Sequence, residues 1–194
     1  MEDESRARAS PHAGPALPIE LSGFRRGWFE RGTGPGLGTT FLGVVPQREG
    51  RLNAVAYRVD LQELASTDRR ESSYCRLPVP KSAIRLLAPA AAGTFDGEVW
   101  IYVAHSGTPP AEAYPIVQSY VDVFLAGCLE QEARFGVRGF AVECVRTTHD
   151  WSAYWVNDRI YPRRPFIYQP RARQIDEILS AEVAKYWPDA MGRP

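Results

Sequence analysis

Residues 66–79, STDRRESSYCRLPV, place four consecutive charged residues that end at Glu71 directly before an apolar, strand-like run. The residues upstream predict a short helix over residues 61–69, because Asp60 and Glu63 have the spacing of a capping box. Glu71 is therefore expected at the point where this helix passes into a strand.

The side chain of Glu71 has two interpretations. A carboxylate at a helix–strand junction can be held rigidly and partly desolvated, which raises its pKa toward that of a general base. From the residues alone, a surface ion pair with Arg69 or Arg70 is favoured, because exposed pairs of this kind are common. Both interpretations stay open at this level.

Strand-like runs flank the junction on both sides. Six runs carry alternating or β-branched apolar residues: residues 19–30, 39–45, 53–59, 74–79, 82–88 and 98–104. So many short strands in so little sequence favour a closed or strongly curved sheet. They predict a small, mostly antiparallel β-barrel of roughly five to seven strands.

The pattern changes to helical spacing after residue 110. Apolar residues recur every three to four positions over residues 116–129, and Gly136 is expected to end this helix. Residues 172–187 predict a second amphipathic helix, and a shorter helix is expected over residues 140–148. A β-rich half followed by a helical half predicts the α+β class, with helices that flank the barrel and a helical C-terminal extension.

The length of 194 residues predicts a single domain over residues 1–194. Residues 1–18 are polar and proline-rich and are expected to form a flexible N-terminal segment. Residues 19–105 are expected to form the barrel core, and residues 110–194 the helical part and the C-terminal extension.

Composition and charge exclude several partners. The 23 basic and 23 acidic residues give a net charge of zero, so binding to nucleic acid is not expected. No apolar stretch resembles an export signal or a membrane span, so no membrane partner is expected. Cys75, Cys128 and Cys144 lack CxxC spacing and lie in apolar segments, which predicts buried free thiols and a cytoplasmic location. None of these patterns fixes the oligomeric state.

Other site motifs are weak. The glycines at 32, 34, 36 and 38 precede a strand, so a hairpin loop is favoured over a dinucleotide-binding fingerprint. His12, His105 and His149 have no carboxylate or cysteine partners at metal-ligand spacing, so neither a metal site nor a cofactor is expected. The chain also contains no Gly-x-Ser-x-Gly motif, which disfavours a hydrolase of that type.

Four segments together resemble the γ-glutamylcyclotransferase-like family. They are LSGFRRGWFERG (21–32), FLGVVPQREGRLNAVAYRV (41–59), LQELASTDRRESSYCRLPV (61–79) and PPAEAYPIVQSYVDVFLAGCLE (109–130). The resemblance covers roughly residues 19–130, and Asp68 to Tyr74 is its most specific part. Residues 147–165 resemble an extension found in a bacterial branch of the family. The resemblance implies a small β-barrel with flanking helices.

The resemblance also implies an activity. Family enzymes cyclise a γ-glutamyl amine or peptide: its free α-amine attacks its own γ-carbonyl and releases 5-oxoproline and an amine. Glu71 would be the general acid/base, while Asp68 and the neighbouring arginines would shape the turn that holds it. Gly43, Val44 and Tyr120 fall at substrate-binding positions, although an aromatic residue at helical spacing is more often part of a core.

One family feature is missing from this sequence. Family members open with a strand that ends in a Tyr-Gly-Ser-Leu-like loop, whose backbone N–H groups bind the substrate. The chain contains no such motif, so it is expected to lack this strand and loop unless the true start lies upstream of Met1. A noncatalytic ligand-binding or interaction module on the same fold is therefore the alternative function.

Overall fold

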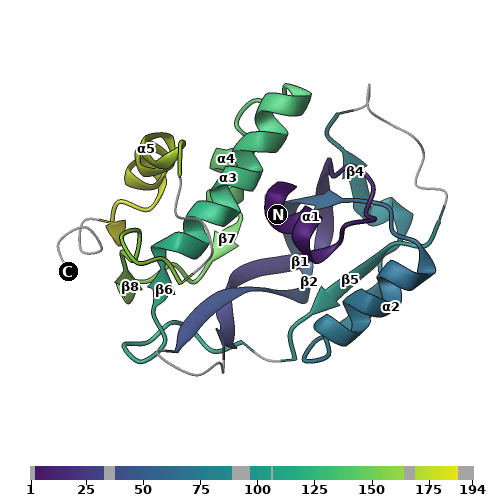
Figure 1. Cartoon of the computed structure of the whole chain (residues 1–194), viewed down its shortest axis with the longest axis horizontal. Helices are drawn as coiled ribbons and strands as arrows, with labels where there is room; N and C mark the ends of the chain where they lie inside the picture. Colours follow the sequence, from purple (N-terminus) through teal and green to yellow (C-terminus); the bar gives the residue numbers. More distant parts are fainter. Residues whose placement is uncertain (1–2, 33–37, 89–96, 106, 164–168, 188–194) are drawn as a thin grey trace.

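Two long antiparallel strands, β1 (Leu17–Gly32) and β2 (Thr39–Ala56), form the centre of the fold (Figure 1). The computed structural model describes residues 3–32, 38–88, 97–105, 107–163 and 169–187. Gly23 interrupts the regular pairing of β1, and its φ of 88° lies in the left-handed region that favours glycine. The two strands expected at 39–45 and 53–59 fall largely within the single strand β2, so this division was wrong.

Shorter strands complete three separate sheets. β4 (Ile84–Leu86) and β7 (Thr148–His149) pair with β1, β3 (Cys75–Pro78) pairs with β5 (Trp100–Val103), and β6 (Ile116–Val117) pairs with β8 (Trp155–Val156). The predicted closed barrel of five to seven strands is therefore wrong: the described residues form eight strands in sheets that do not close. A backbone hydrogen bond of 2.9 Å from Ala104 N to Val44 O links the end of β5 to β2.

The described helices are α1 (Asp3–Ala9), α2 (Leu61–Arg70), α3 (Gln118–Phe135), α4 (Phe140–Arg146) and α5 (Ala172–Glu182), with a short 3-10 helix, η1 (Lys81–Ala83). Four of them, α2 to α5, lie close to the expected residues, whereas α1 and the 3-10 helix were not predicted. Asp60 caps α2 as predicted, because its side chain accepts a hydrogen bond of 2.7 Å from the backbone N–H of Glu63. Gly136 ends α3 in the left-handed conformation. The α+β class is confirmed.

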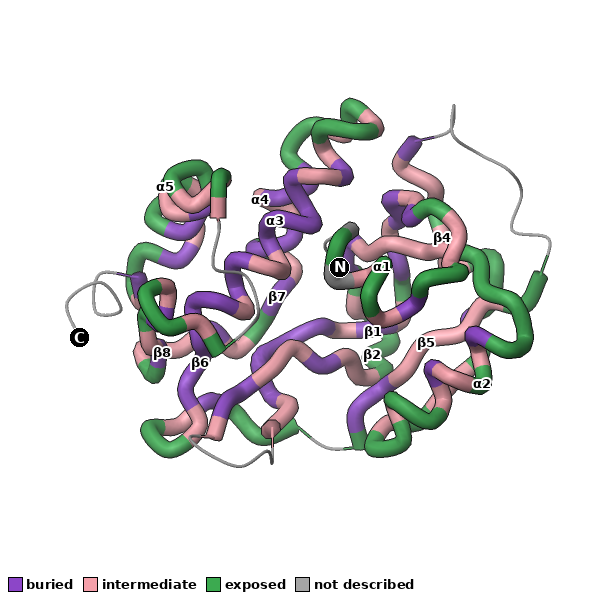
Figure 2. Tube along the Cα trace, in the orientation of Figure 1, coloured by how far each residue is buried: buried purple, intermediate pink, exposed green. Residues whose placement is uncertain are grey.

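The helices α3, α4 and α5 form a layer beside the long strands, and α2 lies at the other end of the molecule (Figure 1). Two apolar cores correspond to this division, and both lie along the buried faces in Figure 2. The sheet core is built from Ile19, Leu21, Phe24, Leu52, Val79 and Val103. The helical core includes five aromatic residues of β1 and the C-terminal half: Trp28, Phe140, Trp151, Trp155 and Trp187.

The described part of the N-terminal segment, for which a flexible stretch was expected over residues 1–18, contains α1 and the start of β1. Arg6 donates a hydrogen bond of 2.9 Å from Nη1 to the carbonyl of Gly14, and Ser10 and Ala16 are buried. A hydrogen bond from Arg70 to the carbonyl of Ala9 joins the C-terminal ends of α1 and α2.

The cysteine prediction also needs correction. Cys128 of α3 and Cys144 of α4 form a disulfide, and Cys75 is an exposed free thiol. The prediction of three buried free thiols is wrong, because the packing of α3 on α4 brings the two helical cysteines together. The thiol argument for a cytoplasmic location therefore no longer holds. None of the helices in the described part of the chain has the length and hydropathy needed to cross a membrane.

Candidate active site

Glu71 lies in a hydrogen-bonded turn between α2 and β3. Its backbone N–H donates to the carbonyl of Thr67 at 2.8 Å and closes the last turn of α2. Its own carbonyl accepts from the N–H of Tyr74 at 2.9 Å. Backbone bonds on both sides therefore fix the position of Glu71, as expected for a residue at a helix–strand junction.

The carboxylate of Glu71 forms an ion pair with the preceding residue. Arg70 donates from Nε to Glu71 Oε1 at 3.0 Å, which is the predicted ion pair, and the Glu71 side chain is 29% exposed. Arg70 is itself held by a bond of 2.7 Å from Nη1 to the carbonyl of Ala9, at the end of α1. No donor among the described residues bonds Oε2, so this oxygen is available to a ligand.

Asp68 shapes the same turn from the preceding helical turn. It accepts a hydrogen bond of 2.7 Å from the hydroxyl of Tyr102 on β5, and Arg76 Nε lies 3.4 Å from the same oxygen. Asp68 thus ties the end of α2 to the β3–β5 pair, which agrees with a structural role for this residue.

Tyr74 is the point where three elements meet. Burial raises the pKa of the Tyr74 hydroxyl, and the nearby charges of Glu30, Tyr120 and Glu71 raise this pKa further. These groups come from the end of β1, the first turn of α3 and the end of α2. Tyr74 is therefore a neutral hydroxyl at neutral pH and can both donate and accept a hydrogen bond.

Glu30 is a second carboxyl group at this place. Burial raises the pKa of Glu30, while the neighbouring His105 lowers it by a smaller amount. No local pattern in the sequence singled out Glu30, because one glutamate near a strand end is common on protein surfaces. The site can therefore supply two carboxyl groups and a phenol to a small polar ligand.

The raised pKa of Glu30 gives a pH-dependent stability. Above the ordinary glutamate pKa of 4.5 the unfolded chain releases the Glu30 proton more readily than the folded chain does, so stability falls as pH rises through the folded-state pKa. The Glu30→Gln variant lacks this contribution. As pH rises from about 4 to about 8, we expect the melting temperature of the variant to increase relative to that of the wild type. A difference in melting temperature that stays constant over this range would contradict the assignment.

Gly43 and Val44, the predicted substrate-binding residues of β2, have packing roles in the sheet. Gly43 lies opposite Gly27 in the β1–β2 pair, and a Cβ on Gly43 would lie 2.6 Å from Cε2 of Phe29. Val44 packs against the sheet core. The absence of a side chain at Gly43 thus makes room for the ring of Phe29, and substrate binding by Gly43 and Val44 stays a prediction.

The Gly43→Ala variant tests this packing. The added methyl group forces the ring of Phe29 to move, and overpacking of this kind costs about 1–3 kcal/mol of unfolding free energy. Gly97→Ala is the matched control, because nothing lies within 4 Å of a Cβ placed there. Urea unfolding of both variants measures the difference, and an unchanged midpoint for Gly43→Ala would contradict the close approach of Phe29.

Tyr120 packs against the helical core, which was the alternative to substrate binding for this residue. It also lies near the site. Its ring packs edge-on against Trp28 at 5.8 Å and Phe41 at 5.1 Å between ring centroids. Its hydroxyl also acts electrostatically on Tyr74. The ring is therefore held by the core at a position close to Tyr74.

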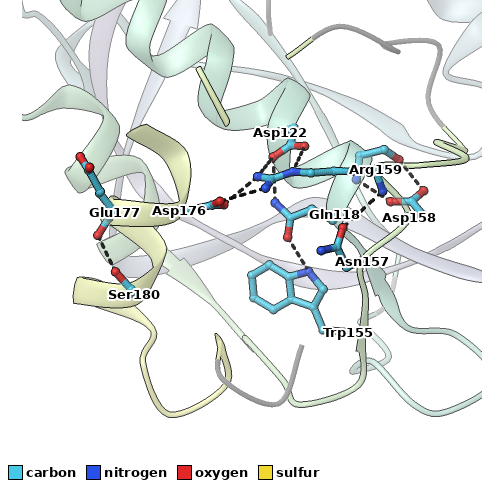
Figure 3. A network of polar contacts seen from close by, with 10 residues as sticks. Gln118, Asp122, Trp155, Asn157, Asp158, Arg159, Asp176, Glu177 and Ser180 are labelled. Atoms are coloured by element: carbon cyan, nitrogen blue, oxygen red, sulfur yellow. Dashed lines mark hydrogen bonds and ion pairs between the residues drawn. The ribbon is translucent and has the colours of Figure 1, made fainter. Parts of the chain in front are cut away.

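A polar network holds the first turn of α3, which carries Tyr120 (Figure 3). Arg159 donates to both oxygens of Asp122 at 2.8 Å and to both oxygens of Asp176 at 2.7 and 3.0 Å. Gln118 donates to Asp122 at 2.8 Å and accepts from Trp155 Nε1 at 3.1 Å. The network joins α3, the segment after β8 and α5, so it fixes the C-terminal extension against the long helix.

Asp158 caps α3 from outside the helix. Its carboxylate accepts hydrogen bonds of 2.7 Å from both the backbone N–H and the hydroxyl of Ser119. The sequence pattern did not reveal this cap, because Asp158 lies far from Ser119 along the chain. The buried Asp122 within an apolar helical pattern was the available indication that α3 contacts a cation.

Arg26 is a buried cation that bonds neutral acceptors. It donates to the hydroxyls of Thr147 and Thr148, to the carbonyls of Asn53 and Cys144, and to the side chain of Asn53. Burial lowers the pKa of Arg26 to about 10, so the guanidinium stays charged at neutral pH. It links β1 and β2 to α4 and β7, which is a structural role.

Two further features lie outside this site. A surface depression lined by Pro78, Val79, Lys81, Gly97, Glu98 and Val99 lies at the end of β3 away from Glu71. In the described ranges, no three His, Cys, Asp or Glu side chains are grouped so that they could hold a metal ion.

The comparisons with known proteins agree with this geometry at the level of the fold. No protein-family model and no curated protein matches the sequence. One solved structure, described as a "Gamma-glutamyl cyclotransferase", matches with a TM-score of 0.52 over 93% of this chain and 92% of that chain, at 12% identity. The fold is that of a γ-glutamyl cyclotransferase. An uncharacterized human protein matches with a TM-score of 0.49 over 75% of this chain and 82% of that chain, at 13% identity.

The described strands of this cyclotransferase-like fold form three separate sheets and no closed barrel. Glu71, Glu30 and Tyr120 belong to different elements, and each interacts electrostatically with Tyr74. An identity of 12% shows the fold alone, so the chemistry of the site depends on its own residues.

Proposed function

We propose that this chain is a γ-glutamylcyclotransferase-type enzyme that converts a γ-glutamyl amine or peptide into 5-oxoproline and a free amine. The observation that carries the proposal is the position of Glu71, fixed by backbone hydrogen bonds and within electrostatic range of the half-buried Tyr74. The fold and the sequence resemblance around Glu71 support the same reaction.

The reaction suits a site with one well-held carboxylate. The α-amine of the substrate attacks its own γ-carbonyl carbon, so the nucleophile is part of the substrate. Glu71 accepts a proton from this nitrogen and returns it to the leaving nitrogen as the C–N bond breaks. Folding the substrate so that its amine faces its carbonyl contributes the proximity effect.

Tyr74 and Glu30 have supporting roles in this proposal. The neutral hydroxyl of Tyr74 can donate a hydrogen bond to the substrate carbonyl, where negative charge develops during attack. Glu30 can accept hydrogen bonds from polar groups of the γ-glutamyl part. This mechanism requires neither a metal nor a cofactor, and its partner is a small molecule.

The test is an assay for 5-oxoproline by mass spectrometry. The purified chain is incubated with γ-glutamyl amines, γ-glutamyl amino acids and a γ-glutamyl tripeptide, with the α-glutamyl isomers as controls. We expect 5-oxoproline and the free amine in equal amounts from at least one γ-glutamyl compound and from none of the isomers. Absence of 5-oxoproline from the whole panel would overturn the proposal.

A noncatalytic ligand-binding module is the second candidate. The observation that favours it is the contact of Arg70 with both Glu71 Oε1 and the carbonyl of Ala9, which engages one oxygen of the candidate base. A binding module predicts that a γ-glutamyl compound raises the melting temperature without product formation. Turnover of the same compound would exclude this second candidate.

A further inference from the structure

Cys75 and His105 form a side-chain pair next to the candidate active site. Cys75 is the first residue of β3, and its thiol is exposed. It pairs across the strands with Val103 of β5, and His105 follows two residues later. The Cys75 Sγ atom lies 3.6 Å from Nδ1 and 3.7 Å from Nε2 of His105.

This contact gives the thiol a base. The sulfur lies almost equally far from the two ring nitrogens, so a small rotation of either side chain presents one nitrogen to the S–H group. Transfer of the proton to the imidazole yields a thiolate, which is the nucleophilic form of cysteine. An exposed thiolate is also accessible to reagents in solution.

Charged groups of two other residues lie near the pair. Glu30 of β1 interacts electrostatically with His105. The neighbouring cation, Arg76, is engaged elsewhere: it pairs with Asp68 and lies over the ring of Trp100. His105 is therefore the ionisable side chain that the described residues place in contact with the Cys75 thiol.

We propose that Cys75 is a modification site that takes up a low-molecular-weight thiol by exchange with the corresponding disulfide. The Cys75 thiolate attacks one sulfur of the disulfide RSSR. A new bond forms between Cys75 Sγ and that sulfur, the original S–S bond breaks, and RS⁻ leaves and takes up a proton. The disulfide is the oxidant, and His105 holds the proton that Cys75 gives up.

The buried cysteines do not compete in this reaction. Cys128 and Cys144 are already joined in a disulfide and are 6% and 2% exposed, so small reagents do not reach them. Adduct formation on the folded chain is therefore a direct measure of Cys75.

The experiment follows the mass of the intact protein during incubation with hydroxyethyl disulfide. We expect a single adduct on the wild type, none on Cys75→Ser, and a rate for His105→Gln on the order of tenfold lower near pH 7. His149→Gln is the matched control, since His149 is also exposed but lies on β7, and its rate should equal that of the wild type.

The pH dependence of the adduct formation rate shows whether His105 acts as a base or only affects access to Cys75. The rates of the wild type and His105→Gln should converge at high pH, where thiols in general ionise without a neighbouring base. Equal rates near pH 7, or no adduct on the wild type, would overturn the proposal. A rate difference that persists at high pH would overturn the role of His105 as the base.

The adduct would lie close to the candidate site, because His105, which contacts Cys75, also interacts electrostatically with Glu30. We therefore expect the modified protein to form 5-oxoproline more slowly and dithiothreitol to restore the rate. This expectation rests on the proposed function, whereas the mass measurement does not. If the adduct forms but turnover does not change, the adduct does not inhibit the enzyme. The exchange reaction and the enzyme activity would both remain supported by that result.

Discussion

The Glu71→Gln variant is expected to lose on the order of a hundredfold to ten-thousandfold in the rate of 5-oxoproline formation. Glutamine keeps the size of the side chain and can still accept a hydrogen bond from Arg70, but it cannot take up a proton at neutral pH. The reaction requires that the α-amine lose a proton and that the leaving nitrogen gain one. Both transfers would then depend on water.

The loss of activity can be separated from a loss of stability. The Arg70–Glu71 ion pair is partly exposed, and such pairs contribute about 0–1 kcal/mol, so the variant should unfold close to the wild type. Glu177→Gln serves as the matched control, because Glu177 is an exposed carboxylate on α5 away from the site. Steady-state kinetics of the three proteins measures the effect. Turnover by Glu71→Gln within twofold of the wild type would remove Glu71 from the mechanism.

The local elements of this fold follow from residues that are close in sequence. The cap formed by Asp60 at the start of α2 and the left-handed Gly136 at the end of α3 each depend on backbone groups within one helical turn. The junction that holds Glu71 is local in the same sense, because its bonds join Thr67, Glu71 and Tyr74. A sequence pattern can therefore predict such features.

The features that sequence reasoning missed depend on contacts between distant segments. Alternating apolar residues indicate strands, but they do not tell which strands pair, so the open sheets were mistaken for a barrel. The disulfide between Cys128 and Cys144 depends on how α3 packs on α4. Glu30 gains its place in the site because β1 runs past Tyr74, and no neighbour in sequence reveals this.

The Arg159→Ala variant is expected to lose about 3–5 kcal/mol of unfolding free energy, as is usual when one partner of a buried ion pair is removed. The Asp122 side chain is fully buried, and Arg159 bonds both of its oxygens. Burial alone would lower the pKa of Arg159, but the hydrogen bonds that it donates to Asp122 and Asp176 raise its pKa above the usual range. Without the guanidinium, the charge of Asp122 stays buried with Gln118 as a neutral donor.

Urea unfolding measures this loss, and Arg173→Ala is the matched control. The Arg173–Glu177 pair on α5 is exposed, so its removal should cost less than about 1 kcal/mol. If Arg159→Ala costs no more than this control, the network in Figure 3 does not hold the C-terminal extension.

A second substitution identifies the physical cause of the loss. If the cost comes from an uncompensated buried charge, neutralising that charge should return part of the stability, so the double variant Asp122→Asn/Arg159→Ala should unfold at higher urea than Arg159→Ala alone. Asparagine can still accept the hydrogen bond from Gln118, which keeps this polar contact. If the double variant is less stable than Arg159→Ala, lost packing by the long arginine side chain is the main cause, and the charge of Asp122 is tolerated without its partner.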